Sequence, residues 1–189
     1  MKRIVIFASG SGSNAENIIK YFQSTQTAIV THVLSNNGKA KVFDRCEKLG
    51  VDASLFDKDS FINDDTVLNF LLTEADFIVL AGFLWRVPAK IIAAFPNKII
   101  NIHPALLPKY GGKGMYGMHV HNAVKENNDP ETGITIHYVN ENYDEGAVIF
   151  QAKTSISSED TSETIAQKVH ELEYKHFPKV IEEVILQNE

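Results

Sequence analysis

Short apolar runs alternate with amphipathic segments through the first hundred residues of the chain. The apolar runs are rich in β-branched and aliphatic residues, as buried strands are, and they cover residues 3–8, 28–35, 53–57, 76–83 and 98–103. The segments between them carry apolar residues at helical spacing and cover residues 15–23, 41–50, 65–75 and 88–96. Strands that are apolar on both faces and alternate with helices predict a parallel sheet covered on both sides.

The pattern changes after residue 130. Residues 132–139 and 147–156 indicate two neighbouring strands joined by a short acidic loop. Residues 162–187 indicate a long helix, in which Pro178 predicts a kink or a break. The expected fold class is therefore α/β: a single domain over residues 1–189, with a Rossmann-like, mostly parallel twisted sheet, helices on both faces and an antiparallel addition near the C-terminal end.

Composition excludes several classes of protein. The net charge of −6 gives no electrostatic basis for broad nucleic-acid binding. Cys46 is the only cysteine, which excludes a disulfide framework and fits a reducing compartment. No run approaches the roughly 20 apolar residues of a membrane span, and the N-terminal apolar run is too short for a signal peptide. We expect a cytoplasmic monomer or homodimer that acts on small molecules, without nucleic-acid or membrane partners.

The first predicted strand leads into the Gly- and Ser-rich turn ASGSGSN at residues 8–14. Gly10 and Gly12 permit tight backbone turns, and Ser13 or Asn14 is placed to cap the following helix. Backbone N–H groups at the start of a helix favour an anion, so the turn predicts a phosphate site. An ordinary Gly/Ser turn and a dinucleotide site of the GxGxxA type remain alternatives.

A second loop, LAGFLWRVP at residues 80–88, gathers apolar side chains behind Gly82. It predicts either a slot for a flat heterocycle or simple packing at the rim of the core. This loop, the turn at residues 8–14 and the sequence NIHP at residues 101–104 each follow a predicted strand. Because ligands of such sheets bind at the carboxyl ends of the strands, we expect all three on one rim.

The sequence NIHP ends a predicted strand with two polar residues. Side chains alternate along a strand, so Asn101 and His103 share one face, and Pro104 stops the ladder. Such a pair suits the stabilisation of an oxyanion together with proton movement. Asp144, in the acidic loop, is a candidate partner that raises the pKa of His103. A hydrogen-bonded histidine at a strand end and an ordinary hairpin turn are the plain alternatives.

The remaining histidines carry weaker signals. His119 and His121 form an H-x-H pair, which on a strand would face one way and suit a metal. No further ligands are evident, so we predict no metal site. The other histidines have no clear partner in the sequence: His32, His137, His170 and His176.

Taken in order, the motifs SGSGSN, LAGF, NIHPALLPKY and an Asp-containing loop before GAVIFQAK form a recognisable set. The chain resembles the phosphoribosylglycinamide formyltransferases, a family of folate-dependent one-carbon transferases, from residue 3 to about residue 180. NIHPALLPKY is specific for folate-dependent formyl transfer, and SGSGSN narrows the resemblance to the branch that accepts a nucleotide.

The resemblance implies a role for each matching residue. The catalytic positions are Asn101, His103 and Asp144. The positions for the ribonucleotide are Gly12, Ser13 and Asn14 at its phosphate and His170 and Glu173 at its glycinamide end. The positions that line the pterin pocket are Leu84, Trp85, Arg86 and Val87, with Asn101.

Three features depart from the family pattern. Trp85 stands where the commonest form of the motif has Arg. A basic folate contact has no counterpart near Ser60 or Phe61. The stretch at residues 110–121 is longer than usual, and its Lys113 is a candidate replacement for the missing charge.

The resemblance implies transfer of the formyl group of 10-formyltetrahydrofolate to the amino group of N1-(5-phospho-D-ribosyl)glycinamide in de novo purine (IMP) biosynthesis, without a metal. The amine attacks directly, Asn101 and a charged His103 stabilise the tetrahedral oxyanion, and Asp144 keeps His103 charged.

Four alternatives are weighed against this reading. A formyltetrahydrofolate hydrolase is expected to carry a regulatory domain before the first strand, and that strand begins at residue 3. A methionyl-tRNA formyltransferase is expected to add a basic C-terminal domain. A non-catalytic nucleotide- or folate-binding module would retain the fold alone. A dinucleotide-dependent oxidoreductase needs an acidic residue after the second strand, where Asn36 and Asn37 stand.

Overall fold

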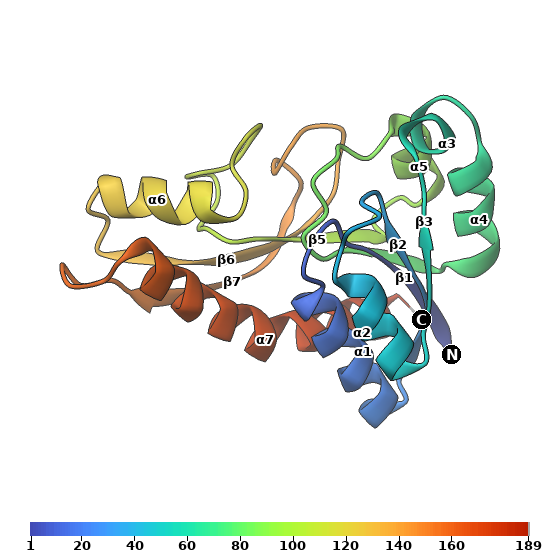
Figure 1. Ribbon diagram of the computed structural model, residues 1–189, viewed down its shortest axis with the longest axis horizontal. Coiled ribbons are helices and arrows are strands. Elements are labelled where there is room, and N and C mark those ends of the chain that lie inside the picture. The colour runs from blue at the N-terminus through green and yellow to red at the C-terminus, as the bar shows by residue number, and fades with distance from the viewer. Residues whose placement is uncertain (189) are drawn as a thin grey trace. The chain divides into compact units, whose positions relative to one another are not determined.

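The computed structural model describes residues 1–188 and contains an α/β arrangement (Figure 1). The strands are β1 (Lys2–Phe7), β2 (Ala28–Ser35), β3 (Asp52–Leu55), β4 (Phe77–Leu80), β5 (Ile99–His103), β6 (Glu131–Tyr138) and β7 (Val148–Ser155). The helices are α1 (Ser13–Thr25), α2 (Val42–Leu49), α3 (Lys58–Ile62), α4 (Thr66–Glu74), α5 (Ala89–Ala94), α6 (Met118–Glu126) and α7 (Ser162–Gln187).

The strand order of the sheet is β3-β2-β1-β4-β5-β6-β7. Strand β1 pairs in parallel with β2 and β4, and β2 pairs in parallel with β3. Strands β6 and β7 pair antiparallel. The predicted fold class, a mostly parallel sheet with an antiparallel addition near the C-terminal end, is therefore confirmed.

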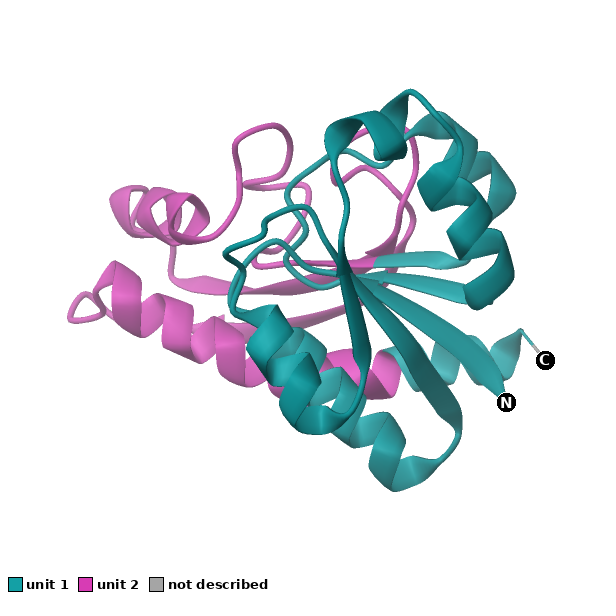
Figure 2. Ribbon diagram, turned by 45° about the vertical axis from the view of Figure 1, so that its right-hand side comes forward, with its two compact units in different colours: residues 1–100, 181–189 teal, residues 101–180 magenta. Residues whose placement is uncertain are grey.

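The chain forms two compact units, coloured separately in Figure 2. Unit 1 comprises residues 1–100 and 181–188. Its helices α1 and α2 cover one face of its strands, and α3, α4 and α5 cover the other (Figure 1). The core of this unit includes Ile4, Val5 and Ile6 of β1, all with no exposed surface. Their burial on both faces explains why β1 is apolar from Ile4 onward.

Unit 2 comprises residues 101–180. Helix α6 and the part of α7 in this unit lie on opposite sides of β6 and β7 (Figure 1). A core cluster joins the start of the loop after β5 to both helices through Ala105, Val120, Val124 and Ile165. This cluster fixes the segment that follows His103.

The structure excludes a break at Pro178 and adds two helices to the predicted elements. Helix α7 runs through Pro178 without a break. The short helix α3 and the helix α6 were not predicted. None of the described helices is long and apolar enough to cross a membrane.

Candidate active site

The amide of Asn101 is held by a histidine on the neighbouring strand of unit 2. Asn101 Nδ2 lies 3.1 Å from Nε2 of His137. His137 Nδ1 lies 2.8 Å from the carbonyl oxygen of Tyr138. A carbonyl only accepts, so Nδ1 carries the proton, and in the neutral ring Nε2 is left to accept an N–H of Asn101. This contact uses one N–H of the amide and leaves the second for another acceptor.

His103 has an acceptor at each ring nitrogen. Its Nε2 lies 2.7 Å from the carbonyl oxygen of Tyr110, to which it donates, and its Nδ1 lies 3.5 Å from Oδ2 of Asp144. The predicted meeting of His103 and Asp144 is confirmed, although the distance exceeds that of a close hydrogen bond. Asp144 Oδ1 also lies 3.7 Å from Nε2 of His137, so one carboxylate faces both rings.

The charge states of the pair are set by burial and by each other. Burial lowers the pKa of His103 below its ordinary 6.5, and the Asp144 carboxylate and the Tyr110 carbonyl oppose this only in part. Asp144 therefore raises the pKa of His103, as predicted, but desolvation outweighs this attraction and the net shift is downward. Burial by itself raises the pKa of Asp144, but the His137 ring, the Gly112 N–H and the positive charge that His103 carries when protonated together lower it. Both directions favour a neutral imidazole beside a carboxylate.

The backbone around this pair takes unusual conformations. Tyr110 has φ 55° and Asp144 has φ 56°, a left-handed region that non-glycine residues seldom occupy. Gly112, with φ 94°, donates its N–H to Asp144 Oδ2 at 3.0 Å. Uncommon backbone conformations concentrate at functional sites, where surrounding contacts hold them. Here they bring a carbonyl to His103 and an N–H to Asp144.

A buried carboxylate with histidines lies elsewhere in unit 2. Glu173 is 5% exposed, and its Oε2 lies 2.9 Å from Nδ1 of His170, three residues earlier on α7. This hydrogen bond raises the pKa of His170. His121 is 4% exposed, and its Nδ1 has no hydrogen-bond partner among the described residues. Burial lowers the pKa of His121, while the negative charge of Glu173 acts in the opposite direction.

The H-x-H pair does not have the geometry considered for a metal. His119 and His121 lie on α6, not on a strand, and helical residues two apart do not share a face. His121 is buried, whereas His119 is exposed and packs edge-on against the ring of Tyr116. Within residues 1–188, no group of three or more His, Cys, Asp or Glu side chains is placed to hold a metal ion.

In unit 1, the Gly/Ser turn leads directly into α1. The cap residue is Gly12, with φ 71° and no side-chain hydrogen bond, so the prediction that Ser13 or Asn14 caps the helix is wrong. A side chain at Gly12 would not fit, because its Cβ would lie 2.6 Å from Cβ of Val42. Gly12 thus provides no side-chain cap for the first N–H groups of α1, and N–H groups at the start of a helix favour an anion.

The loop after β4 meets this turn within unit 1. Ser9 N donates to the carbonyl oxygen of Gly82 at 3.1 Å, and the N–H of Leu84 donates to Ser9 Oγ at 3.0 Å. The expected neighbourhood of these two loops is confirmed. Gly82 has φ 77°, which turns the chain at the end of the strand.

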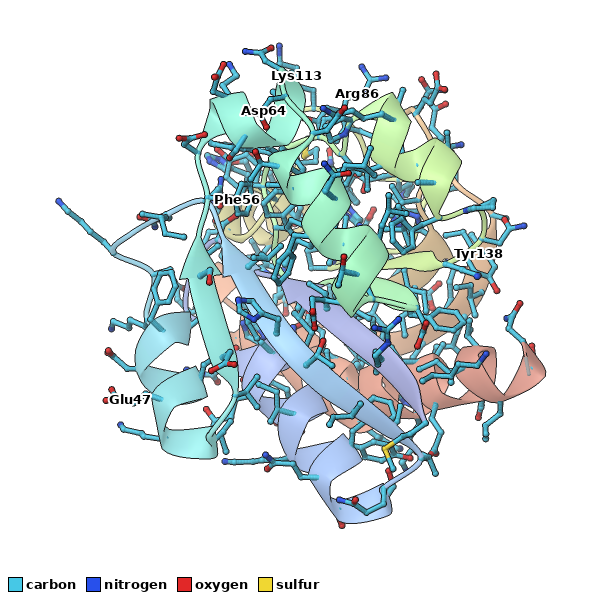
Figure 3. The ribbon with its side chains drawn as sticks, turned by 90° about the vertical axis from the view of Figure 1, so that its right-hand side faces the viewer. Glu47, Phe56, Asp64, Arg86, Lys113 and Tyr138 are labelled. Carbon is cyan, nitrogen blue, oxygen red and sulfur yellow. The ribbon has the colours of Figure 1, made fainter. Side chains whose placement is uncertain are left out.

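Trp85 joins an aromatic cluster beneath this loop. Its ring lies edge-on to Phe56, with centroids 5.9 Å apart, and also contacts Phe61 and Phe83. Leu84 is 49% exposed, whereas Val87 is 6% exposed. Figure 3 shows Phe56 and Arg86 toward the end of unit 1 where the parallel strands finish, with Glu47 toward the opposite end. Packing at the rim thus explains the aromatic residues, while Leu84 and Arg86 of the same loop are exposed.

Two contributors were missed by the sequence analysis. His137 was assigned no partner, although it contacts Asn101 and Asp144. A signal existed, because the polar residues Thr135 and His137 share one face of the strand, opposite Ile134 and Ile136. Thr135 donates to the carbonyl oxygen of Ala105 at 2.7 Å, which secures the loop after β5. Tyr110 contributes a backbone carbonyl, for which residue type gives no signal.

An α/β fold in which a half-buried Asn and a half-buried Asp contact two buried histidines is typical of an enzyme that stabilises an oxyanion and moves a proton. Comparison with known proteins specifies the class. The profile of the formyl transferase family matches residues 2–181. The chain belongs to the formyl transferase family.

Individual relatives carry more specific names. The chain is 35% identical to the phosphoribosylglycinamide formyltransferase of Bacillus subtilis, covering 98% of this chain and 95% of that protein. It is 34% identical to the chloroplastic phosphoribosylglycinamide formyltransferase of Arabidopsis thaliana, covering 95% of this chain but only 64% of the plant protein. The crystal structure of the Bacillus halodurans phosphoribosylglycinamide formyltransferase superposes with a TM-score of 0.87 at 33% identity, covering 100% of this chain and 97% of that one.

Proposed function

We propose that the protein transfers the formyl group of 10-formyltetrahydrofolate to the amino group of N1-(5-phospho-D-ribosyl)glycinamide, a step of de novo purine (IMP) biosynthesis. We further propose that residues 1–189 act as one formyltransferase domain, in the cytoplasm, as a monomer or homodimer. The relatives that match most of this chain bear the name of this reaction.

One observation carries the proposal: Asn101, His103 and Asp144 come together in unit 2, with a second histidine that orients Asn101. Formyl transfer needs a donor for the carbonyl oxygen and a group that accepts and returns a proton. The amide and the imidazole supply these two functions.

The substrate contacts are proposed from the matching positions. Gly12, Ser13 and Asn14 hold the phosphate, because the N–H groups at the start of α1 favour an anion. Glu173 and His170 bind the glycinamide end, where a buried carboxylate suits an amine. The loop Leu84–Val87 binds the pterin through its backbone, together with Asn101.

In the first chemical step, the amine of the nucleotide attacks the formyl carbon. The formyl oxygen becomes an oxyanion, and the second N–H of Asn101 donates to it. The new C–N bond leaves a positive charge on the attacking nitrogen. Because His103 is neutral at rest and Tyr110 occupies Nε2–H, the lone pair on Nδ1 accepts the excess proton.

In the second step, the imidazolium returns its proton. The carboxylate of Asp144, 3.5 Å from Nδ1, stabilises the charged ring while the intermediate exists. His103 then protonates N10 of the folate, the C–N10 bond breaks, and the oxyanion collapses to the new formamide. Protons and charge balance, with neutral His103 restored.

The test is formation of tetrahydrofolate from 10-formyltetrahydrofolate with and without the nucleotide. We expect turnover only with the nucleotide. Turnover without it would show a hydrolase, and none in either mixture would show a binding module. The variant His103→Ala should lose activity, whereas His32→Ala, a histidine of β2 in unit 1, should retain it.

A further inference from the structure

The two ring nitrogens of His103 compete for one proton. In the neutral ring the proton resides on Nε2 or on Nδ1. On Nε2 it is donated to the carbonyl oxygen of Tyr110 at 2.7 Å, and on Nδ1 it faces the carboxylate of Asp144 at 3.5 Å. A carboxylate is a stronger acceptor than a carbonyl, so at equal distance the proton would lie on Nδ1, toward Asp144. The tautomer therefore depends on how closely the Tyr110 carbonyl is held to the ring.

The position of that carbonyl depends on an uncommon conformation of Tyr110. Its φ of 55° is disfavoured for a residue with a β-carbon. Only surrounding contacts keep a residue in such a region. The ring of Tyr110 supplies one set, because it packs against the core cluster formed by Ala105, Val120, Val124 and Ile165.

The hydroxyl group of Tyr110 supplies the second set of contacts that hold this conformation. Its hydroxyl donates to Oδ2 of Asp129 at 2.8 Å and accepts from Nδ2 of Asn127 at 2.9 Å. Asp129 is also paired with Lys109, whose ammonium lies 3.2 Å from Oδ1. The hydroxyl thus has both a donor and an acceptor partner beyond α6, and it holds the side chain at its far end.

We propose that Tyr110 is a positioning residue that selects the tautomer of His103: its phenol, held by Asp129 and Asn127, keeps the Tyr110 carbonyl on Nε2–H, and this leaves Nδ1 unprotonated toward Asp144. The proposal rests on the proposed formyl transfer, in which that lone pair accepts the proton of the amine. In the other tautomer Nδ1–H is already donated to Asp144, and the ring offers no acceptor there.

The first measurement is independent of the reaction. The full chain is labelled with ¹⁵N-histidine, and the ring nitrogen signals of His103 are identified by their loss in His103→Gln. We expect wild-type signals of an Nε2–H tautomer without substrates. In Tyr110→Phe, which retains the ring and its packing, the signals should shift toward Nδ1–H.

The second measurement is steady-state kinetics of the same variant. We expect kcat to fall about tenfold, the scale of a small displacement at a reacting group, with the KM of both substrates unchanged. Asp129→Asn should shift the nitrogen signals and kcat in the same direction as Tyr110→Phe. In the double variant, the fold-decrease in kcat should be smaller than the product of the two single fold-decreases. The control is Tyr116→Phe in the same loop, whose exposed phenol makes none of these contacts and should change neither readout.

Each other result overturns the proposal. Unchanged signals with a lower kcat would make Tyr110 merely structural, and shifted signals with an unchanged kcat would show that the tautomer does not govern the reaction. Unchanged nitrogen signals together with an unchanged kcat would show that the Tyr110 phenol has no role in positioning His103. If the wild type transfers no formyl group, the proposed function fails, and the nitrogen signals still decide whether Tyr110 sets the His103 tautomer.

Discussion

Asn101 Nδ2 lies 3.1 Å from Nε2 of His137, a ring that the carbonyl oxygen of Tyr138 fixes from its other side. The amide of Asn101 is thereby oriented before any substrate binds. Preorganised donors are effective because they need not reorganise when charge develops. His137 is 2% exposed, so water cannot readily replace it as the partner of the amide.

Replacement of His137 by Phe should therefore impair catalysis through Asn101. The ring volume is retained, but the amide loses its acceptor and turns away from the formyl oxygen. We expect kcat to fall on the order of 10²-fold, as for loss of an oxyanion donor. In the double variant His137→Phe with Asn101→Ala, kcat should be little lower than in Asn101→Ala alone. Both changes remove the same oxyanion donor, so their effects on kcat should not add. The same change at His32, outside this site, is the control, and additive losses would contradict the coupling.

Replacement of Asp144 by Asn tests the charge assigned to the pair. Asn tolerates the φ of 56° at this position, so folding should be retained. The carboxylate raises the pKa of His103 against burial, and its loss lowers that pKa further. Because the neutral ring is the active form, activity rises with pH through this pKa. The acid limb of kcat should therefore move to lower pH, while the plateau falls about 10²-fold without imidazolium stabilisation.

The profile of kcat between pH 4 and pH 8 gives the position of the acid limb and the height of the plateau in one experiment. Glu145→Gln, in the same loop and exposed, should leave limb and plateau unchanged. A shift of the limb to higher pH would show instead that the charged form of His103 is active.

The sequence predicted the parts of the fold that burial alone determines. Strand β4 and residues 4–7 of β1 are apolar because both faces of a parallel sheet are covered. Helix α3 has only five residues after its Asp57 cap, too few for a helical period to appear. Helix α6 follows Gly117, which makes no side-chain cap hydrogen bond, and its His-Val-His sequence was considered only for a strand. Both were therefore missed.

The site was predictable only where chemistry depends on residue type. Asn101, His103 and Asp144 stood out as polar groups at a strand end and in a loop. The contact of His137 with Asn101 depends on tertiary placement of residues 36 positions apart. The resting charge of His103 depends on its burial, which the motif does not contain. The sequence thus contained the reacting groups, and folding determined their protonation.

Replacement of Glu173 by Gln should affect the nucleotide and not the folate. The carboxylate is 5% exposed and hydrogen-bonded to His170, so it is a desolvated acceptor for an amine. A hydrogen bond to a charged group contributes about 1.5–3 kcal/mol, so KM for the nucleotide should rise roughly ten- to a hundredfold. Glu171→Gln, exposed on the same helix, is the matched control. An equal rise in KM for 10-formyltetrahydrofolate would contradict the assignment.

Replacement of Gly12 by Ala should destabilise the turn that precedes α1. The φ of 71° disfavours a side chain, and the new Cβ would lie 2.6 Å from Cβ of Val42. Strain and overlap together should lower the free energy of unfolding by about 2–4 kcal/mol, measured by urea denaturation. Gly10→Ala is the control, because nothing lies within 4 Å of its Cβ, and it should change stability by less than about 1 kcal/mol. Where Gly12→Ala still folds, the displaced N–H groups should raise KM for the nucleotide. A variant with wild-type stability and wild-type nucleotide KM would refute the close approach of the turn to Val42 and its role at the phosphate.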